Sequence, residues 1–228
     1  MKTGREKRGQ FIIIAVMLTA VMIVSIGALM HNAITYYKHE PWEEYSTLIG
    51  DIEINSRRLV ELSLASYTNS SEPITSNLAK WENDLIDAYP SSGITLTSSG
   101  AQMLSSSRID YRTTKSSAQA SFTLDIQSIG LEGYAFNVLT SVTLKIGTPT
   151  AINSTTNEII AVVKSETGMP VTDLSAANFK IENATKISVG SIYDKTNILE
   201  YKIVYDGPTN ALVEVWDQRG IHVVASQT

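Results

Sequence analysis

From Phe11 to Met30 the sequence contains no charged side chain, and this apolar stretch limits the architectures open to the chain. As an α-helix at about 1.5 Å per residue it would reach roughly 30 Å, the thickness of the hydrocarbon core of a bilayer. A buried helix of a soluble domain rarely lacks a polar stripe over such a length. The stretch therefore predicts an N-terminal transmembrane helix over residues 11–30.

The charges on either side of this stretch predict its orientation. Basic residues crowd the first eight positions, whereas Lys38 is the only Lys or Arg between His31 and Glu44. Basic flanks are retained on the cytoplasmic side of a membrane. We therefore expect a single-pass protein of the cell membrane, with a cytoplasmic N-terminus and with residues 31–228 extracytoplasmic.

Three fates are open to such a segment: removal as a secretory signal, retention as an anchor, or use as the assembly helix of a filament. A secretory signal has an apolar run of about 7 to 15 residues and a small-residue cleavage site. The run here is longer, and it lacks a good cleavage site, so removal is the least favoured fate. An uncleaved anchor fits the segment fully.

The third fate rests on the residues "KRGQFIII" at positions 7–14. They resemble the processing site of type IV pilins, especially archaeal ones, in which a short basic leader ends in glycine and a dedicated peptidase cuts after it. The resemblance implies a processing site with Gly9 as the last leader residue and Gln10 as the first mature residue. Ile14 stands where many bacterial pilins carry glutamate, as an apolar residue commonly does in archaeal members. Cleavage and simple anchoring both stay open.

Composition excludes several classes of function. The chain has 228 residues, no cysteine and a formal net charge of -5. Disulfides, thiol nucleophiles and thiolate metal sites are therefore excluded, and the acidic balance argues against a nucleic-acid partner.

Two amphipathic helices are expected beyond the apolar stretch. Residues 41–67 and 77–89 carry apolar residues at helical spacing, with Ser76 as the candidate N-cap of the second helix. From Ile94 the period changes to two, as in half-buried strands. We expect strands over residues 121–128, 136–146, 158–165, 178–183, 186–193, 199–205, 211–217 and 221–226.

Residues 162–183, "VVKSETGMPVTDLSAANFKIEN", are similar to the opening of bacterial and archaeal Ig-like surface domains. The resemblance implies a turn shaped by Gly168 and Pro170. It also implies that Val171, Leu174 and Phe179 close one end of a β-sandwich.

The predicted fold class is α+β: an N-terminal transmembrane helix, two amphipathic helices, and a mainly antiparallel, Ig-like β-sandwich as the exterior region. Whether the last two parts share one core is left open. The expected domain boundaries are a cytoplasmic basic leader over 1–10, the transmembrane helix over 11–30, a helical stalk over 31–91, a β-rich region over 92–148 and an Ig-like sandwich over 149–228.

No residue pattern points to catalysis. His222 is expected to be structural or exposed, Asp84 and Asp87 to form a solvated helix face, and no histidine has metal-ligand spacing. We therefore predict a chain that is not an enzyme and has no catalytic, cofactor or metal site. Three glycosylation sequons fit an exterior protein; they begin at Asn69, Asn153 and Asn183.

These patterns together favour a membrane-anchored cell-surface protein, a pilin-like structural or accessory subunit of a surface filament or secretion assembly. The alternative is a single-pass exterior binding or adhesion module that does not polymerise. The expected partners are the lipid bilayer and copies of the chain itself or other pilin-like subunits.

Overall fold

The computed structural model describes residues 17–31, 42–194, 196 and 198–226. The chain divides into two compact units, residues 1–50 and 51–228, and the division falls inside helix α2 (Trp42–Ser70). In the first unit, residues 17–31 form a helix.

The predicted transmembrane helix over residues 11–30 is wrong on the described structure. In this region the structure describes a helix over residues 17–31. Among the described residues, no helix is both long enough and apolar enough to cross a membrane. Residues 11–16 lie outside the described residues.

The two predicted amphipathic helices are confirmed as α2 and α3 (Ile74–Ala88). Ile52, Val60 and Leu64 are buried on α2, at a spacing that places them on one helical face. The predicted N-cap at Ser76 is wrong, because α3 begins just after Pro73, whose extended backbone starts the helix.

Ten strands, all in antiparallel pairs, form two sheets within residues 51–228. The larger sheet has seven strands in the order β1-β2-β3-β5-β8-β7, with β4 pairing with β5, and the smaller has the order β10-β9-β6. The strands and the short helices η1 and η2 are β1 (Ile94–Asp110), β2 (Thr113–Ile126), η1 (Gln127–Ile129), β3 (Leu131–Ile146), β4 (Thr150–Ala151), β5 (Thr156–Ser165), η2 (Ala176–Asn178), β6 (Phe179–Ile181), β7 (Thr185–Tyr193), β8 (Leu199–Asp206), β9 (Val213–Trp216) and β10 (His222–Ala225).

The larger sheet runs without interruption through both predicted β regions. Strand β3 pairs with β5 from Val142↔Ser165 to Ile146↔Ala161. Strands that sequence analysis assigned to residues 92–148 and to residues 149–228 therefore belong to one sheet, in one compact unit.

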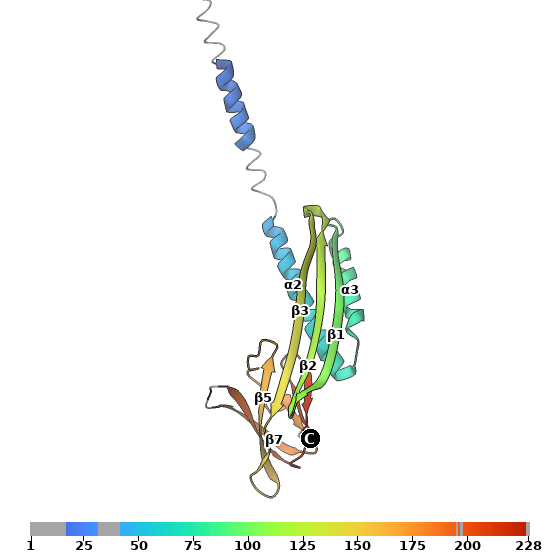
Figure 1. Ribbon diagram of the computed structural model, residues 1–228, viewed down its shortest axis with the longest axis vertical. Helices are drawn as coiled ribbons and strands as arrows, with labels where there is room; N and C mark the ends of the chain where they lie inside the picture. The colour runs from blue at the N-terminus through green and yellow to red at the C-terminus, as the bar shows by residue number, and fades with distance from the viewer. Residues whose placement is uncertain (1–16, 32–41, 195, 197, 227–228) are drawn as a thin grey trace, which may run out of the picture. The chain divides into compact units, whose positions relative to one another are not determined.

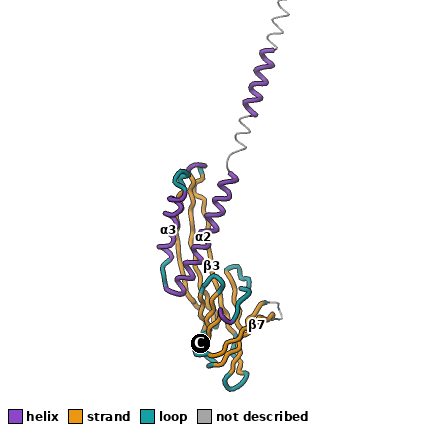
Figure 2. The backbone as a smooth tube through the Cα atoms, turned by 180° about the vertical axis from the view of Figure 1, so that it is seen from behind, coloured by secondary structure: helices purple, strands orange, loops and turns teal. Residues whose placement is uncertain are grey.

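One face of the larger sheet is covered along its length. Helix α3 and the α2 residues after Gly50 lie behind β1, β2 and β3 in Figure 1 and in front of them in Figure 2. Further along the same face, the hydroxyls of Thr114 and Ser116 on β2 bond to β10 of the smaller sheet. The result is a β-sandwich-like fold with helices over one part of the larger sheet.

The opposite face of the larger sheet carries no second layer among the described elements, and we call it the open face. Along β5, buried Ile159, Ala161 and Val163 alternate with half-exposed neighbours that point to this side. A sheet covered on one side explains why a period of two predicted the strands so well.

The segment that leads into β6 carries the three apolar residues that the resemblance to Ig-like domains assigned to the end of a sandwich. Leu174 and Phe179 are buried, whereas Val171 is only half-buried. The Tyr201 hydroxyl donates to Val171 O over 2.7 Å and accepts from Leu174 N over 3.3 Å. Gly168 has a φ of 78°, the left-handed conformation that the turn requires.

Candidate functional site

A concavity lies on the open face of the larger sheet. It is a groove of about 400 Å³, bordered by strands β2, β3, β5 and β8 and by the loop between β7 and β8. The pairing of the strands brings the lining residues of the groove together. Lys145 lies opposite Thr113 on β2 and Val162 on β5, and Thr143 lies opposite Lys164. Directly opposite residues share a face, so these side chains lie together.

The floor of the groove is apolar and its surroundings are charged. Ile160, Val162 and Ile198 supply apolar surface, and five charged residues line the same space. They are Asp110, Lys145, Lys164, Asp194 and Glu200. Neither lysine forms an ion pair with any residue that the structure describes. An apolar floor with charged groups of both signs suits a ligand that has an apolar centre and polar ends.

Asp194 holds the loop at one side of the groove. Its Oδ1 accepts hydrogen bonds from Ile198 N over 2.7 Å and from the hydroxyl of Thr196 over 2.8 Å. These bonds lower the pKa of the Asp194 carboxyl below its ordinary value, so its negative charge is kept at neutral pH. The loop therefore presents a fixed anion to the groove.

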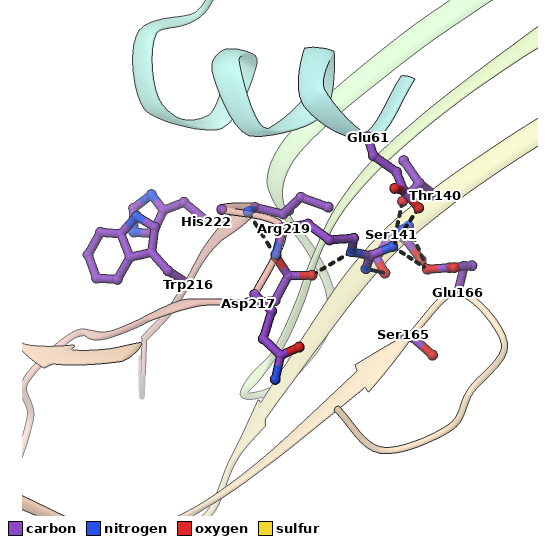
Figure 3. A network of polar contacts seen from close by, with 12 residues as sticks. Glu61, Thr140, Ser141, Ser165, Glu166, Trp216, Asp217, Arg219 and His222 are labelled. Carbon is purple, nitrogen blue, oxygen red and sulfur yellow. Dashed lines mark hydrogen bonds and ion pairs between the residues drawn. The ribbon is translucent and has the colours of Figure 1, made fainter. Parts of the chain in front are cut away.

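A second polar cluster, centred on Arg219, joins α2 to the sandwich (Figure 3). Its guanidinium lies 2.8 Å from Asp217 Oδ2, 3.1 Å from Glu166 Oε2 and 3.3 Å from Glu61 Oε1. It also donates to the Thr140 hydroxyl over 3.0 Å and to the carbonyl of Ser141 over 3.3 Å.

The carboxylates of this cluster stabilise the charged form of Arg219. Burial by itself would lower the pKa of the Arg219 guanidinium, but its hydrogen bond to Asp217 and the charges of Asp217 and Glu166 raise that pKa overall. The hydrogen bonds of Arg219 end on oxygens of four chain segments: α2, β3, the turn after β5 and the turn before β10. We interpret this cluster as a structural clamp, because its guanidinium is already occupied.

A third cluster lies on the smaller sheet. The ring of His222 stacks on Trp216 with centroids 4.3 Å apart, and its Nε2 lies 3.0 Å from Glu214 Oε2. Glu214 also pairs with Lys180 over 3.0 Å. His222 is therefore half-buried and in contact with both residues.

The other predicted positions are scattered over the molecule. Asp84 and Asp87 are exposed on α3, and in the parts of the chain that are described no group of three or more His, Cys, Asp or Glu could hold a metal ion. The candidate processing site at Gly9 and Gln10 lies outside the described residues.

The three sequon asparagines are exposed but not equivalent. Asn69 Nδ2 donates to Ala65 O over 2.6 Å and to Gly220 O over 3.0 Å. Asn153 uses Oδ1, which accepts from Thr155 N and Thr156 N. The side-chain nitrogen of Asn69, to which a glycan would be attached, therefore already donates two hydrogen bonds within the protein.

Sequence reasoning missed both the groove and the Arg219 clamp. The groove depends on register between strands that are far apart in sequence, which no single segment shows. Nothing in the segment "DQRG", residues 217–220, indicates that Arg219 reaches β3 and α2. Comparison of the chain with protein-family models, curated proteins and solved structures found no match.

Proposed function

We propose that this chain is a pilin-like structural or accessory subunit of a surface filament or secretion assembly. In this proposal the apolar N-terminal helix packs against the corresponding helices of other subunits. The strand-rich unit, which has an Ig-like sandwich in its C-terminal part, is displayed on the outside of the assembly. We also propose that the chain is not an enzyme and that it lies outside the cell.

The observation that carries it is the exposure of the helix over residues 17–31. Its large apolar side chains are between 53% and 71% exposed, from Ile26 at 53% to Val24 at 71%. Contiguous apolar surface of this kind is unfavourable in water and marks a place of interaction. Identical helices offer a matching apolar surface, and removal of the leader at Gly9 would release the segment for such packing.

The mature N-terminus tests the proposal. The full chain is expressed in a host that has a prepilin-type peptidase, and the N-terminal peptide is identified by mass spectrometry. We expect Gln10 as the first residue, and a Gly9→Val variant that stays uncleaved and yields no assemblies in electron micrographs. An intact terminus at Met1 or Lys2, with no assemblies, would overturn the proposal.

The groove favours a second candidate, an exterior binding module that does not polymerise. Its apolar floor and unpaired lysines are suited to a ligand and are not explained by assembly. Ile160→Glu, which places a charge on the groove floor, would abolish ligand binding and leave assembly intact. Lys202→Gln is the matched control, because Lys202 lies on the same face but is paired with Glu158 over 2.6 Å.

A further inference from the structure

Most strand edges in the described part of the two sheets are closed or short. Strand β10 is closed by side chains on its outer side, because Val224 N donates to Ser106 Oγ over 2.9 Å and His222 O accepts from Ser116 Oγ over 2.7 Å. Strand β6 has only 3 residues. Strand β1 shows three register shifts against β2, and irregular edges resist pairing.

Strand β7 is the exception. It ends the larger sheet, pairs only with β8, and keeps an unbroken register from Ile187 to Tyr193. Residues 188–193, "SVGSIY", contain no charge and no proline, and Tyr193 is 66% exposed. Charges, prolines and bulges are the usual protection of a strand edge, and this segment has none of them. Its one irregularity precedes Ile187.

We propose that residues 188–193 of β7 form a self-association surface, on which a second copy of this chain pairs through the same strand in antiparallel fashion. The occupant is a second copy because the segment is uncharged. Self-pairing brings no like charges together, whereas a charged partner strand would find no complementary charge here. Main-chain hydrogen bonds between the edges supply the attraction.

Symmetry restricts the register of this pairing. A twofold axis perpendicular to the sheet keeps each side chain on its own face, so only residues separated by an even number of positions can lie opposite. A register centred on Ser191 places Tyr193 opposite Val189 and Ile192 opposite Gly190. An aromatic residue beside a β-branched one is a favourable cross-strand pair, and the glycine leaves room for Ile192. The two Ser191 residues then face each other on the axis.

The absence of cysteine from the chain allows a direct test. A Ser191→Cys variant of the full chain, in detergent solution, carries a single thiol at the proposed axis. We expect mild oxidation or a short bis-maleimide to give a covalent dimer. Thr123→Cys is the control, because Thr123 is an exposed strand residue on β2 and is expected to stay monomeric. Equal crosslinking of the two variants would overturn the proposal.

A charge exchange gives a second readout that does not depend on crosslinking. Ser191→Lys and Ser191→Glu each place like charges opposite each other, and we expect each to weaken the dimer about tenfold in sedimentation experiments. Mixing the two variants should restore dimers. Circular dichroism checks that both variants fold, which the exposure of Ser191 favours. Dimerisation that is unchanged in the single variants, or not restored in the mixture, contradicts the proposal.

This inference is independent of the proposed assembly helix. Ser25→Cys reports on packing of the helix over residues 17–31, whereas Ser191→Cys reports on β7. Crosslinking at Ser25 without crosslinking at Ser191 overturns only the edge proposal. The reverse result supports the edge proposal and counts against assembly through the helix.

Discussion

The indole Nε1 of Trp216 donates a hydrogen bond of 3.1 Å to Oδ1 of Asn69, and so ties strand β9 to the C-terminal end of α2. The same asparagine donates from Nδ2 to Gly220 O over 3.0 Å, in the turn between β9 and β10. One side chain thus satisfies a donor and an acceptor of the smaller sheet. We infer that Asn69 is a structural residue and the least suitable of the three sequon asparagines for glycosylation.

Replacement of Asn69 by alanine is expected to destabilise the fold by about 1–2 kcal/mol, because it leaves the Trp216 N–H and the Gly220 carbonyl without their partner. Urea unfolding followed by tryptophan fluorescence measures this loss. Ser71→Ala is the matched control, since it removes the same sequon and leaves the amide in place. For Ser71→Ala we expect no loss of glycan mass and an unchanged stability; a loss of stability equal to that of Asn69→Ala would refute the structural role.

Ser116 lets β2 close the edge of the smaller sheet. It is fully buried, donates to His222 O over 2.7 Å, and accepts from Ser106 N over 2.9 Å. Ser116→Ala leaves both backbone groups unpaired and should cost about 2 kcal/mol in the free energy of unfolding. Its neighbour Ser117 is half-exposed on the open face, and Ser117→Ala should change stability by less than about 0.5 kcal/mol.

Equal effects of Ser116→Ala and Ser117→Ala would show that the hydroxyl does not close the edge. Hydrogen exchange adds a local readout. The amides of β10, especially that of Val224, should lose protection in Ser116→Ala before those of β5 do.

Most strands after residue 156 could be predicted because they alternate large apolar side chains with polar ones, or, as in β5, form a short apolar run. Strand β8 is the clearest case, with Leu199, Tyr201, Ile203 and Tyr205 buried in turn. Strand β1 and the first half of β2 were not predicted as strands of this length, because their inward side chains are Ser116, Ala118 and other small or polar residues. Their strand pairing is supported by hydroxyl bonds to another sheet, which a hydropathy period cannot reveal.

The N-terminal helix shows that hydropathy can also predict an element that the structure does not support. Twenty uncharged residues were enough to predict a span over 11–30, but no helix among the described residues is long and apolar enough to cross a membrane. The groove and the Arg219 clamp could not be predicted from the sequence for a different reason. Glu61, Thr140 and Glu166 meet Arg219 only because α2, β3 and the turn after β5 converge in the fold.

Removal of the guanidinium should be more damaging than removal of any one of its partners. Arg219→Met leaves Asp217, which is 4% exposed, and Glu166 without their cation, and we expect a loss of about 2–4 kcal/mol in the free energy of unfolding. Arg219→Lys keeps the charge but not the geometry that reaches several oxygens, and should recover only part of this loss. A neutral result for Arg219→Met in urea unfolding would show that the clamp contributes nothing to stability.

The clamp also predicts a dependence of stability on pH. Burial alone would raise the pKa of the Glu166 carboxyl, but a hydrogen bond from its own backbone and the charge and hydrogen bond of Arg219 lower it below the ordinary value of 4.5. A carboxyl with a lowered pKa in the folded state stabilises the fold above its ordinary pKa. That contribution disappears as the pH falls through 4.5 and then below the folded-state value.

Glu166→Gln should therefore be less stable than the wild type at pH 7, by on the order of 1 kcal/mol because the site is partly exposed, and the two should converge as the pH falls below 4.5 and through the folded-state pKa. Urea unfolding at a series of pH values between 7 and 3 measures the difference. Glu182→Gln removes an exposed carboxyl of the same charge and corrects for the change in net charge. If the gap between Glu166→Gln and the wild type stays constant across this range after that correction, the carboxylate form of Glu166 does not stabilise the clamp.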